Sequence, residues 1–388
     1  MPDGLKRVLT GKDVVALAFG AVVGWGWVVL SGEWLQTGGT LGAILAFLLG
    51  GTVMLFVGQT YAELTPALPQ CGGEHVFSLR AMGRTGSFIC TWSLILSYVG
   101  VCAFEACALP SVVEYILPNF LQGYLYTIGG FDLYLTWVLV GVVSAVILTC
   151  VNYIGIEPVA KLQRWLTVVI AAVGILLIVA ALFQGETANL SPALPHGVSG
   201  MLSVTVMTPF MLVGFDVIPQ AAEEINIPFR KIGVLILFSI ALAVIWYIAI
   251  IFSVSLMLTG EELAGSTLAT ADAMKKAFGG KQMAAVVLII GGMAGILSSW
   301  NAFFVGGSRT IYAMANSGMI PACFGKLHPK YRTPCNAVLL MGLFCAVAPF
   351  FGKKTMSCLA NAGSFSTVLA YFMVVLSFIL LRKKEPDL

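Results

Sequence analysis

Long apolar segments recur along the whole sequence, and they restrict the fold more than any other feature. A helix needs about 20 mostly apolar residues to cross the hydrocarbon core of a bilayer. Hydrophobic residues make up 59% of the chain and charged residues only 10%, against about 25% charged residues in soluble domains. We therefore predict an all-α polytopic membrane protein with no soluble domain and with ten transmembrane helices: 14–35, 40–62, 87–117, 133–154, 165–184, 200–222, 233–258, 282–315, 336–351 and 356–381.

The positions of the basic residues predict how these helices are oriented. When the N-terminus is placed inside, most of the 21 lysines and arginines fall in the inner connecting segments, as the positive-inside rule requires. We expect a multi-pass protein of the cell membrane with both termini in the cytoplasm. Its partners are then the lipid bilayer and a small-molecule substrate, and not a nucleic acid.

Residue types that carry catalysis or bind metals form no recognisable pattern in the sequence. The nine cysteines are scattered singly, without metal-binding spacing to the three histidines. The sequence also lacks a visible nucleophile–base pair or phosphate-binding loop. We therefore expect no enzyme activity, no resident cofactor and no metal.

Two of the apolar segments, the first and the sixth, are interrupted at corresponding depths. The interrupting residues are Gly20, Gly24 and Gly26 in the first and Pro209, Gly214, Asp216 and Pro219 in the sixth. Glycine and proline weaken helices, and the freed backbone groups are costly in hydrocarbon unless they line a cavity. Paired interruptions of this kind indicate the substrate site of a secondary transporter.

The interrupted helices divide the predicted fold into two equal halves. Helices one to five lie in residues 1–184, and helices six to ten lie in residues 200–382. Because five is odd, the second half enters the membrane from the opposite side. The expected architecture is a five-plus-five inverted repeat whose first and sixth helices are broken at the midplane.

Four groups of short segments carry a family resemblance. They are 20–26, 61–64 with 69–77, 214–216 with 223–230, and 308–315 with 318–321. Together and in this order, they resemble bacterial amino acid permeases of the amino acid–polyamine–organocation superfamily. Members of that family normally have twelve helices, so the resemblance implies that the ten predicted helices form the transport core.

The two breaks offer the backbone groups that an amino acid needs, because its carboxylate and its ammonium are both costly to bury unpaired. We expect the amides of Gly24, Trp25 and Gly26 to bind the carboxylate, and carbonyls of Val22 and Val23 to face the ammonium. The sixth helix is expected to complete the site with Phe210, Met211, Val213 and Gly214. The alternative is that the glycines only allow close helix packing.

Aromatic residues near the breaks bear on selectivity. The resemblance implies that Phe210 is a gating aromatic over the substrate; the alternative is a core aromatic. Trp25 and Trp27 point to different sides of a regular helix, so both face one cavity only if the backbone is extended there. Two such indoles would form a cation–π wall for an amine. Otherwise one of them packs against neighbouring helices.

The third helix contributes Ser97, Tyr98 and Glu105 as candidate substrate-binding residues. Cationic amino acid relatives have a glutamate at the position of Ser97, so the resemblance does not imply their selectivity here. Tyr98 and Glu105 lie nearly on one helix face, about 10.5 Å apart along the axis. Glu105 can pair with a substrate amine, carry a proton or hydrogen-bond a helix break.

Other polar residues have expected supporting roles. Asp216 is expected to brace the break in the sixth helix, and Glu223, Glu224 and Arg309 to be structural or to form an inner gate. The candidates for ion coupling are Ser298 and Ser299, whose hydroxyls can supply oxygens to Na⁺ or bond their own helix backbone. A proton is the other coupling ion considered, although Ile170 replaces the lysine of proton-coupled relatives, and ion-free exchange is equally open.

The expected function is that of a secondary active transporter, an antiporter or a symporter, for a small amino acid or a related zwitterion. One alternative keeps the class and changes the solute to a choline- or ethanolamine-like amine. A third possibility is a channel or a solute sensor. The sequence carries no prediction of the oligomeric state.

Overall fold

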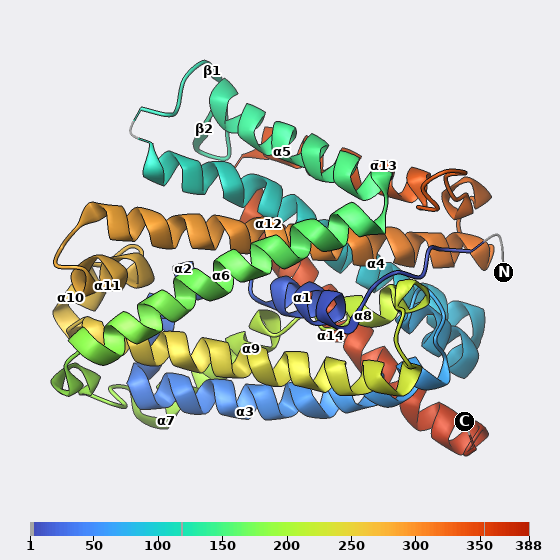
Figure 1. Ribbon diagram of the computed structural model, residues 1–388, viewed down its shortest axis with the longest axis horizontal. Coiled ribbons are helices and arrows are strands. Elements are labelled where there is room, and N and C mark those ends of the chain that lie inside the picture. Colours follow the sequence, from blue (N-terminus) through green and yellow to red (C-terminus); the bar gives the residue numbers. More distant parts are fainter. Residues whose placement is uncertain (1–3, 118, 353, 388) are drawn as a thin grey trace.

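Long helices lie side by side along the longest axis of the molecule and form most of its fold (Figure 1). The computed structural model describes residues 4–117, 119–352 and 354–387. The elements up to residue 190 are α1 (Gly11–Val22), α2 (Gly26–Val29), α3 (Ser31–Ala67), α4 (Glu74–Ile116), β1 (Tyr124–Ile128), β2 (Phe131–Tyr134), α5 (Leu135–Ile154), α6 (Ile156–Gln184) and η1 (Thr187–Leu190).

The remaining elements include several short helices between the long ones. They are α7 (Gly197–Met211), α8 (Val217–Gln220), η2 (Ala222–Glu224), α9 (Phe229–Met257), α10 (Gly260–Gly265), α11 (Ala269–Ala277), α12 (Gln282–Asn316), η3 (Ala322–Gly325), α13 (Cys335–Val347), η4 (Ala348–Phe351) and α14 (Lys354–Lys384). Both chain termini lie at the same end of the molecule, opposite the β1–β2 hairpin (Figure 1).

Seven helices of the described residues are long and apolar enough to cross a membrane: α3, α4, α5, α6, α9, α12 and Asn361–Lys384 of α14. Large apolar side chains are exposed on them, including Phe183 (82%) and Phe365 (73%). Such surfaces suit lipid rather than water. The prediction of a mostly helical, polytopic membrane protein is therefore confirmed, whereas the number of ten transmembrane helices stays a prediction.

Two predicted helix boundaries lie near a glycine with a non-helical backbone inside a long helical element. Helix α3 begins at Ser31, inside the predicted first segment, and passes through Gly39 with φ of 68°. Helix α4 begins at Glu74, well before the predicted start at residue 87, and passes through Gly83 with φ of 74°. Glycine adopts such positive φ values at little cost, and the helical backbone is interrupted at these two residues, between the predicted segments 14–35 and 40–62 and shortly before 87–117.

Two short elements outside the apolar segments were not predicted, although the sequence contains signals for both. The hairpin turns at Gly129 and Gly130, whose φ values are 58° and 82°, and a Gly-Gly pair is typical of such turns. Helix α10 begins with a capping box, in which Thr259 and Glu262 exchange hydrogen bonds of 2.8 and 3.3 Å. The hydrogen bond from Lys276 lowers the pKa of Glu262.

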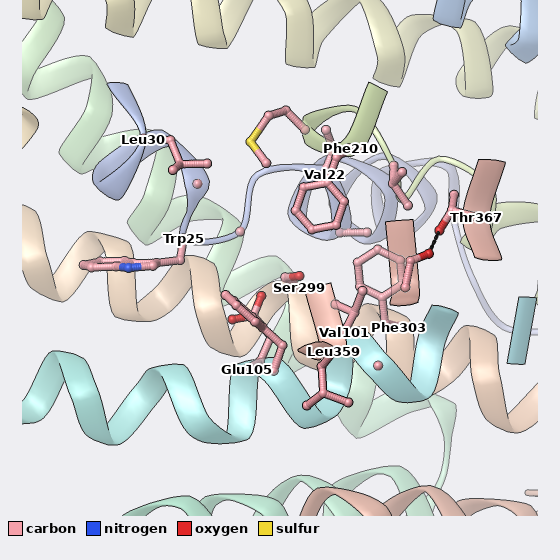
Figure 2. A pocket seen from close by; sticks show the side chains of 18 of the residues that line it. Val22, Trp25, Leu30, Val101, Glu105, Phe210, Ser299, Phe303, Leu359 and Thr367 are labelled. Atoms are coloured by element: carbon pink, nitrogen blue, oxygen red, sulfur yellow. Dashed lines mark hydrogen bonds between the residues drawn. The ribbon is translucent and has the colours of Figure 1, made fainter. Parts of the chain in front are cut away.

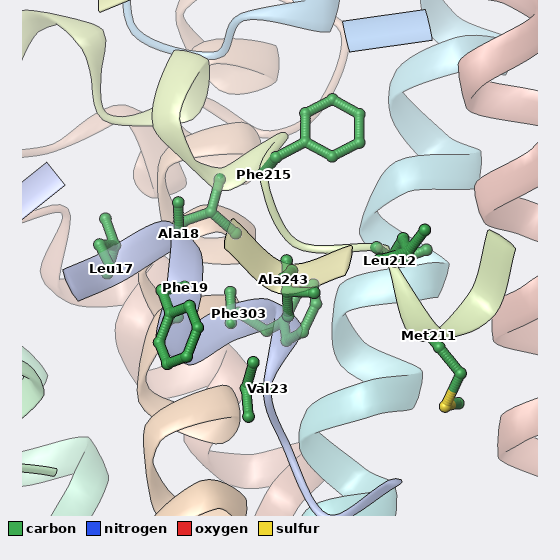
Figure 3. Close-up of a cluster of buried hydrophobic side chains, with 14 of the residues drawn as sticks. Leu17, Ala18, Phe19, Val23, Met211, Leu212, Phe215, Ala243 and Phe303 are labelled. Carbon is green, nitrogen blue, oxygen red and sulfur yellow. The ribbon is translucent and has the colours of Figure 1, made fainter. Parts of the chain in front are cut away.

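Two chain connections cross in close contact at the core of the fold. Helix α1 ends at Val22 and α2 begins at Gly26, while α7 ends at Met211 and α8 begins at Val217. Between the last two, Gly214 has φ of 129°, and a Cβ atom there would lie 2.8 Å from the carbonyl carbon of Ala21. Figure 3 shows the buried side chains around this crossing, among them Leu17, Phe19, Val23, Leu212 and Phe215.

Candidate functional site

A cavity of about 270 Å³ lies beside the α1–α2 connection. Its walls come from α1, α2, α4, α7, α9, α12 and α14, so helices far apart in the sequence meet there. Figure 2 shows Trp25, Phe210 and Phe303 around this space. Because pockets for drug-sized ligands measure about 300–1,000 Å³, the cavity suits a small solute.

Most of the residues predicted to bind substrate line this cavity. They are Val22, Gly24, Trp25, Gly26, Glu105, Phe210, Met211 and Val213, and the coupling candidate Ser299 lines it as well. The α1–α2 and α7–α8 connections therefore border the same space. Substrate binding by these residues stays a prediction.

The other predicted residues lie outside the cavity wall: Val23, Ser97, Tyr98, Gly214 and Ser298. Val23 is buried, and its amide donates to the carbonyl of Phe19 at 2.8 Å. The Ser97 hydroxyl lies 2.5 Å from that of Thr367, which itself lines the cavity. These residues are therefore placed to support the wall rather than to touch a solute.

Asp216 ties the α7–α8 connection to two other helices. Its carboxylate accepts hydrogen bonds from the Tyr98 hydroxyl at 2.5 Å, the Tyr371 hydroxyl at 2.8 Å and the Gly214 amide at 2.9 Å. A buried carboxylate is stable when several donors satisfy it. This geometry agrees with the expectation that Asp216 braces the break, and it engages the hydroxyl of Tyr98, which is not among the residues of the cavity wall.

The two serines considered for sodium binding face different surroundings. The Ser298 hydroxyl accepts a hydrogen bond from the Gln163 amide group at 2.8 Å, and the same group donates to the carbonyl of Ala16 at 3.2 Å. Ser299 instead packs beside Gly24 on the cavity side. Ser299 thus lines the cavity and Ser298 lies outside its wall, and sodium binding by either residue stays a prediction.

The two neighbouring tryptophans are separated by the path of the backbone. Trp25 lines the cavity, whereas Trp27 is fully buried and packs edge-on against Trp246, with ring centroids 5.6 Å apart. The possibility of a cation–π wall made of both indoles is therefore wrong. Of the two tryptophans, Trp25 is the one that lines the cavity.

We predict that Trp25→Leu raises the KM for solute uptake about tenfold, because it removes an aromatic contact worth roughly 1–1.5 kcal/mol. Trp27→Leu is the matched control: it is expected to lower the melting temperature while the KM stays within about twofold. Uptake kinetics and thermal unfolding of both purified variants check this. Equal changes in KM would contradict the assignment of Trp25 to the cavity and Trp27 to the core.

Glu105 differs from the rest of the cavity wall. Its side chain is 4% exposed, and Oε2 has no hydrogen-bond partner among the described residues. The other oxygen, Oε1, lies 3.3 Å from the position that a Cβ atom on Gly24 would take. Figure 2 shows this carboxylate next to Ser299. An acidic group thus sits directly at the α1–α2 connection.

Several cavity residues were missed from the sequence, among them Tyr247, Phe303 and Thr367. Tyr247 is the most informative, because its hydroxyl donates to the carbonyl of Val22 at 3.0 Å. These residues lie on long apolar helices without a local interruption, so the pattern of glycine and proline gives no signal for them.

A buried ion pair joins α12 to η2. The guanidinium of Arg309 donates to both carboxylate oxygens of Glu224 at 2.9 Å, and both side chains are buried. The amides of Val8 and Leu9 donate to the Glu224 carbonyl at 2.8 Å. Helix α12, η2 and the N-terminal segment are thereby joined, and a role of these residues in an inner gate stays a prediction.

Comparison with known proteins relates this chain to membrane transporters. The family model "Amino acid permease" matches residues 13–385. A methylthioribose transporter of Bacillus subtilis is 28% identical over 390 residues, covering 99% of this chain and 83% of the relative. The branched-chain amino acid permease BcaP of the same species is 27% identical over 405 residues, with the same coverage. The vacuolar cationic amino acid transporter 8 of Arabidopsis thaliana is 25% identical over 392 residues, covering 99% and 64%.

The family match spans nearly the whole described chain and agrees with its architecture. The matching relatives are named as permeases and transporters, not as enzymes. The long apolar helices are those of a multi-pass membrane protein. This chain therefore belongs to the amino acid permease family of membrane transporters.

Proposed function

We propose that this protein is a secondary active carrier that moves a small amino acid or a related zwitterion across the cytoplasmic membrane by alternating access. The observation that carries this proposal is the cavity beside the α1–α2 connection, where that connection crosses the α7–α8 connection, together with the buried Arg309–Glu224 pair. Alternating access needs a site that is sealed from one side of the membrane at a time.

The proposed topology follows the sequence. Ten transmembrane helices form two inverted halves, 1–184 and 200–382, and both termini are cytoplasmic. In this arrangement α1 with α2 and α7 with α8 are the broken first and sixth helices, and the Arg309–Glu224 pair lies on the cytoplasmic side. The cavity then faces outward, and Phe210, 37% exposed, can cover a bound solute.

The amides around Gly24 are the proposed site for a substrate carboxylate, and the ring of Trp25 contacts its body. Sodium or proton coupling would act through the groups that border the cavity, Ser299 and Glu105. Exchange without a coupling ion is the third possible mode of transport. Uptake measured under separately imposed sodium and pH gradients distinguishes the three modes.

A second candidate is a carrier for amines rather than amino acids. The specific observation in its favour is the unpaired oxygen of Glu105 in the cavity wall. An amine supplies the positive charge that such a carboxylate needs, without adding a second negative charge.

Uptake into proteoliposomes tests the carrier proposal. The purified protein is offered a panel of labelled amino acids and amines, with sodium and pH gradients imposed separately. We expect saturable uptake of the labelled solute. Unlabelled solute on the opposite side of the membrane should accelerate this uptake, because a carrier reorients faster when its site is occupied. Flux without such acceleration would indicate a channel, and binding without flux would indicate a solute sensor.

A further inference from the structure

Three side-chain amides form a hydrogen-bonded network in the interior, outside the cavity wall. Asn152 of α5 donates to the side-chain oxygen of Asn301 at 3.1 Å, and Asn301 of α12 donates to that of Gln163 at 2.8 Å. The amide nitrogen of Gln163, on α6, donates to the Ser298 hydroxyl at 2.8 Å and to the Ala16 carbonyl of α1 at 3.2 Å. This amide network thus joins α1 to α5, α6 and α12.

The amide network lies in an environment where polar side chains are costly. Its three amides and the Ser298 hydroxyl belong to side chains that are at most 1% exposed, on helices long and apolar enough to cross a membrane. Polar groups in such places need hydrogen-bond partners, and hydrogen bonds between membrane helices contribute about 0.6 kcal/mol each on average. The network therefore stabilises one arrangement of the four helices that it joins.

Gly20 makes room for the end of the amide network at α1. It lies inside the helix Gly11–Val22 and does not interrupt it. A Cβ atom on Gly20 would lie 2.1 Å from the hydroxyl oxygen of Ser298 and 2.3 Å from the amide nitrogen of Gln163. Any side chain at this position would push the Gln163 amide away from α1. Gly20 therefore serves the contact between helices.

Two neighbours of Gln163 on α6 also reach α1. The Thr167 hydroxyl donates to the Ala16 carbonyl at 3.3 Å, and the guanidinium of Arg164 pairs with the carboxylate of Asp13. The Arg164 side chain is 44% exposed, so solvent screens its ion pair. The buried Gln163 amide, in contrast, connects α1 to α12 as well as to α6.

The position of α1 determines where one side of the cavity lies. Helix α1 packs against α6, α9 and α12 (Figure 1), and the connection that follows it brings Gly24 and Trp25 to the cavity. In the proposed topology, α1 is the inner half of the broken first helix. Alternating access moves one group of helices against another around the site. The amide network crosses the boundary at which α1 would part from α6 and α12.

We propose that Gln163 is the positioning residue of α1 in the transport cycle. Its side-chain amide holds α1 against α6 and α12 while the cavity faces outward, and it releases α1 when the inner side opens. This inference rests on the proposed carrier function, and Gln163 acts through α1 rather than by touching the solute. Loss of the contact is expected to favour the released position of α1.

The variant Gln163→Met tests the inference, because it keeps the length of the side chain and removes its hydrogen bonds. Hydrogen–deuterium exchange of the purified protein in detergent reports the local opening of α1. We expect the amides of Gly11–Val22 to exchange about tenfold faster, which corresponds to about 1.4 kcal/mol. In counterflow, the maximal rate of solute transport should fall about threefold or more while the KM stays within about twofold, because the solute contacts are unchanged.

Two further variants sharpen this test. Gln36→Met is the matched control, since Gln36 is exposed and its amide donates to the Leu263 carbonyl at 2.8 Å, away from α1; it should leave deuterium uptake in α1 unchanged. Gly20→Ala should reproduce Gln163→Met, because the added Cβ displaces the same amide. The double variant of Gly20→Ala and Gln163→Met should be no worse than the more severe single variant, because both changes act through one contact.

The outcomes distinguish this inference from the carrier proposal. Wild-type deuterium uptake in α1 of Gln163→Met would overturn the inference and leave the carrier function standing. Faster uptake spread evenly over all helices would also overturn it, because that result indicates a general loss of stability. Faster uptake confined to α1, together with a wild-type protein that shows no counterflow, would retain the contact of Gln163 with α1 and overturn the carrier function.

A second pair of variants decides the matter if Gln163→Met does not fold. Ser298→Ala removes one acceptor of the Gln163 amide, and it should loosen α1 in the same assay. Ser377→Ala is its control, because the buried Ser377 hydroxyl donates at 2.7 Å to the Met373 carbonyl of its own helix. Equal deuterium uptake in α1 of these two variants would contradict the role of the amide network.

Discussion

Replacing Arg309 with alanine is expected to lower the free energy of unfolding by about 3–5 kcal/mol, because it leaves the buried carboxylate of Glu224 without its counter-ion. Both side chains are buried, and two hydrogen bonds of 2.9 Å join them. Removing one partner exposes the full cost of burying the other. Thermal and denaturant unfolding of the purified protein in detergent measure the change.

Arg382→Ala is the matched control for that variant. Arg382 pairs with Glu63 at the surface, where the two side chains are 60% and 51% exposed. Solvent screens such pairs, so the expected loss is only about 0–1 kcal/mol. Equal losses for the two arginine variants would contradict the view that burial makes the Arg309 pair much costlier to break than the surface pair.

A double variant separates the charge from the packing at the same place. Arg309→Met with Glu224→Gln removes both charges and keeps similar volumes. It should recover much of the stability that Arg309→Ala loses, because no unpaired charge is then buried. A double variant as unstable as Arg309→Ala would mean that the hydrogen-bonded contact itself, rather than the uncompensated charge, dominates.

Gly214→Ala is expected to destabilise the protein by about 2–6 kcal/mol and to abolish solute exchange. The φ of 129° is strained for any residue with a side chain, at about 1–3 kcal/mol. The added Cβ would also lie 2.8 Å from the carbonyl carbon of Ala21 and 2.9 Å from the amide of Val22, and overpacking costs about 1–3 kcal/mol more. Because these are backbone atoms, the α1–α2 connection must shift, and the cavity wall shifts with it.

Gly260→Ala provides the control, since a Cβ atom on Gly260 meets no atom within 4 Å. Stability and exchange should both stay near those of the wild-type protein. Unfolding in detergent and counterflow in proteoliposomes report the two effects separately. A Gly214→Ala protein that is stable and exchanges solute normally would rule out the tight crossing of the two connections.

Local composition predicted the part of the candidate site that lies in the chain connections. Gly24 and Gly26 interrupt an apolar segment, and Glu105 is a carboxylate within another; all three line the cavity. Such residues are conspicuous because they are costly in a membrane helix unless something compensates for them. The paired interruptions thus led from the sequence to the place where the cavity lies.

Neighbouring residues of the same type could not be told apart in this way. Trp25 and Trp27 carry the same side chain, and only the course of the backbone after Val22 places one in the cavity and the other against Trp246. The same holds for Ser298 and Ser299, because the amide group of Gln163 from another helix occupies the first of them. Contacts between distant segments leave no trace in the local sequence.

The sequence by itself determined the class of this protein: a mostly helical membrane protein of the amino acid permease family, with interrupted helices and one conspicuous intramembrane glutamate. These properties follow from composition and local pattern, because lipid forces every backbone polar group to be satisfied and so restricts the possible folds. Only the tertiary structure decided which side chains surround the solute space, that Tyr247 engages the Val22 carbonyl, and that Oε2 of Glu105 stays unpaired. Packing between helices far apart in the sequence sets these contacts, and no local pattern encodes them.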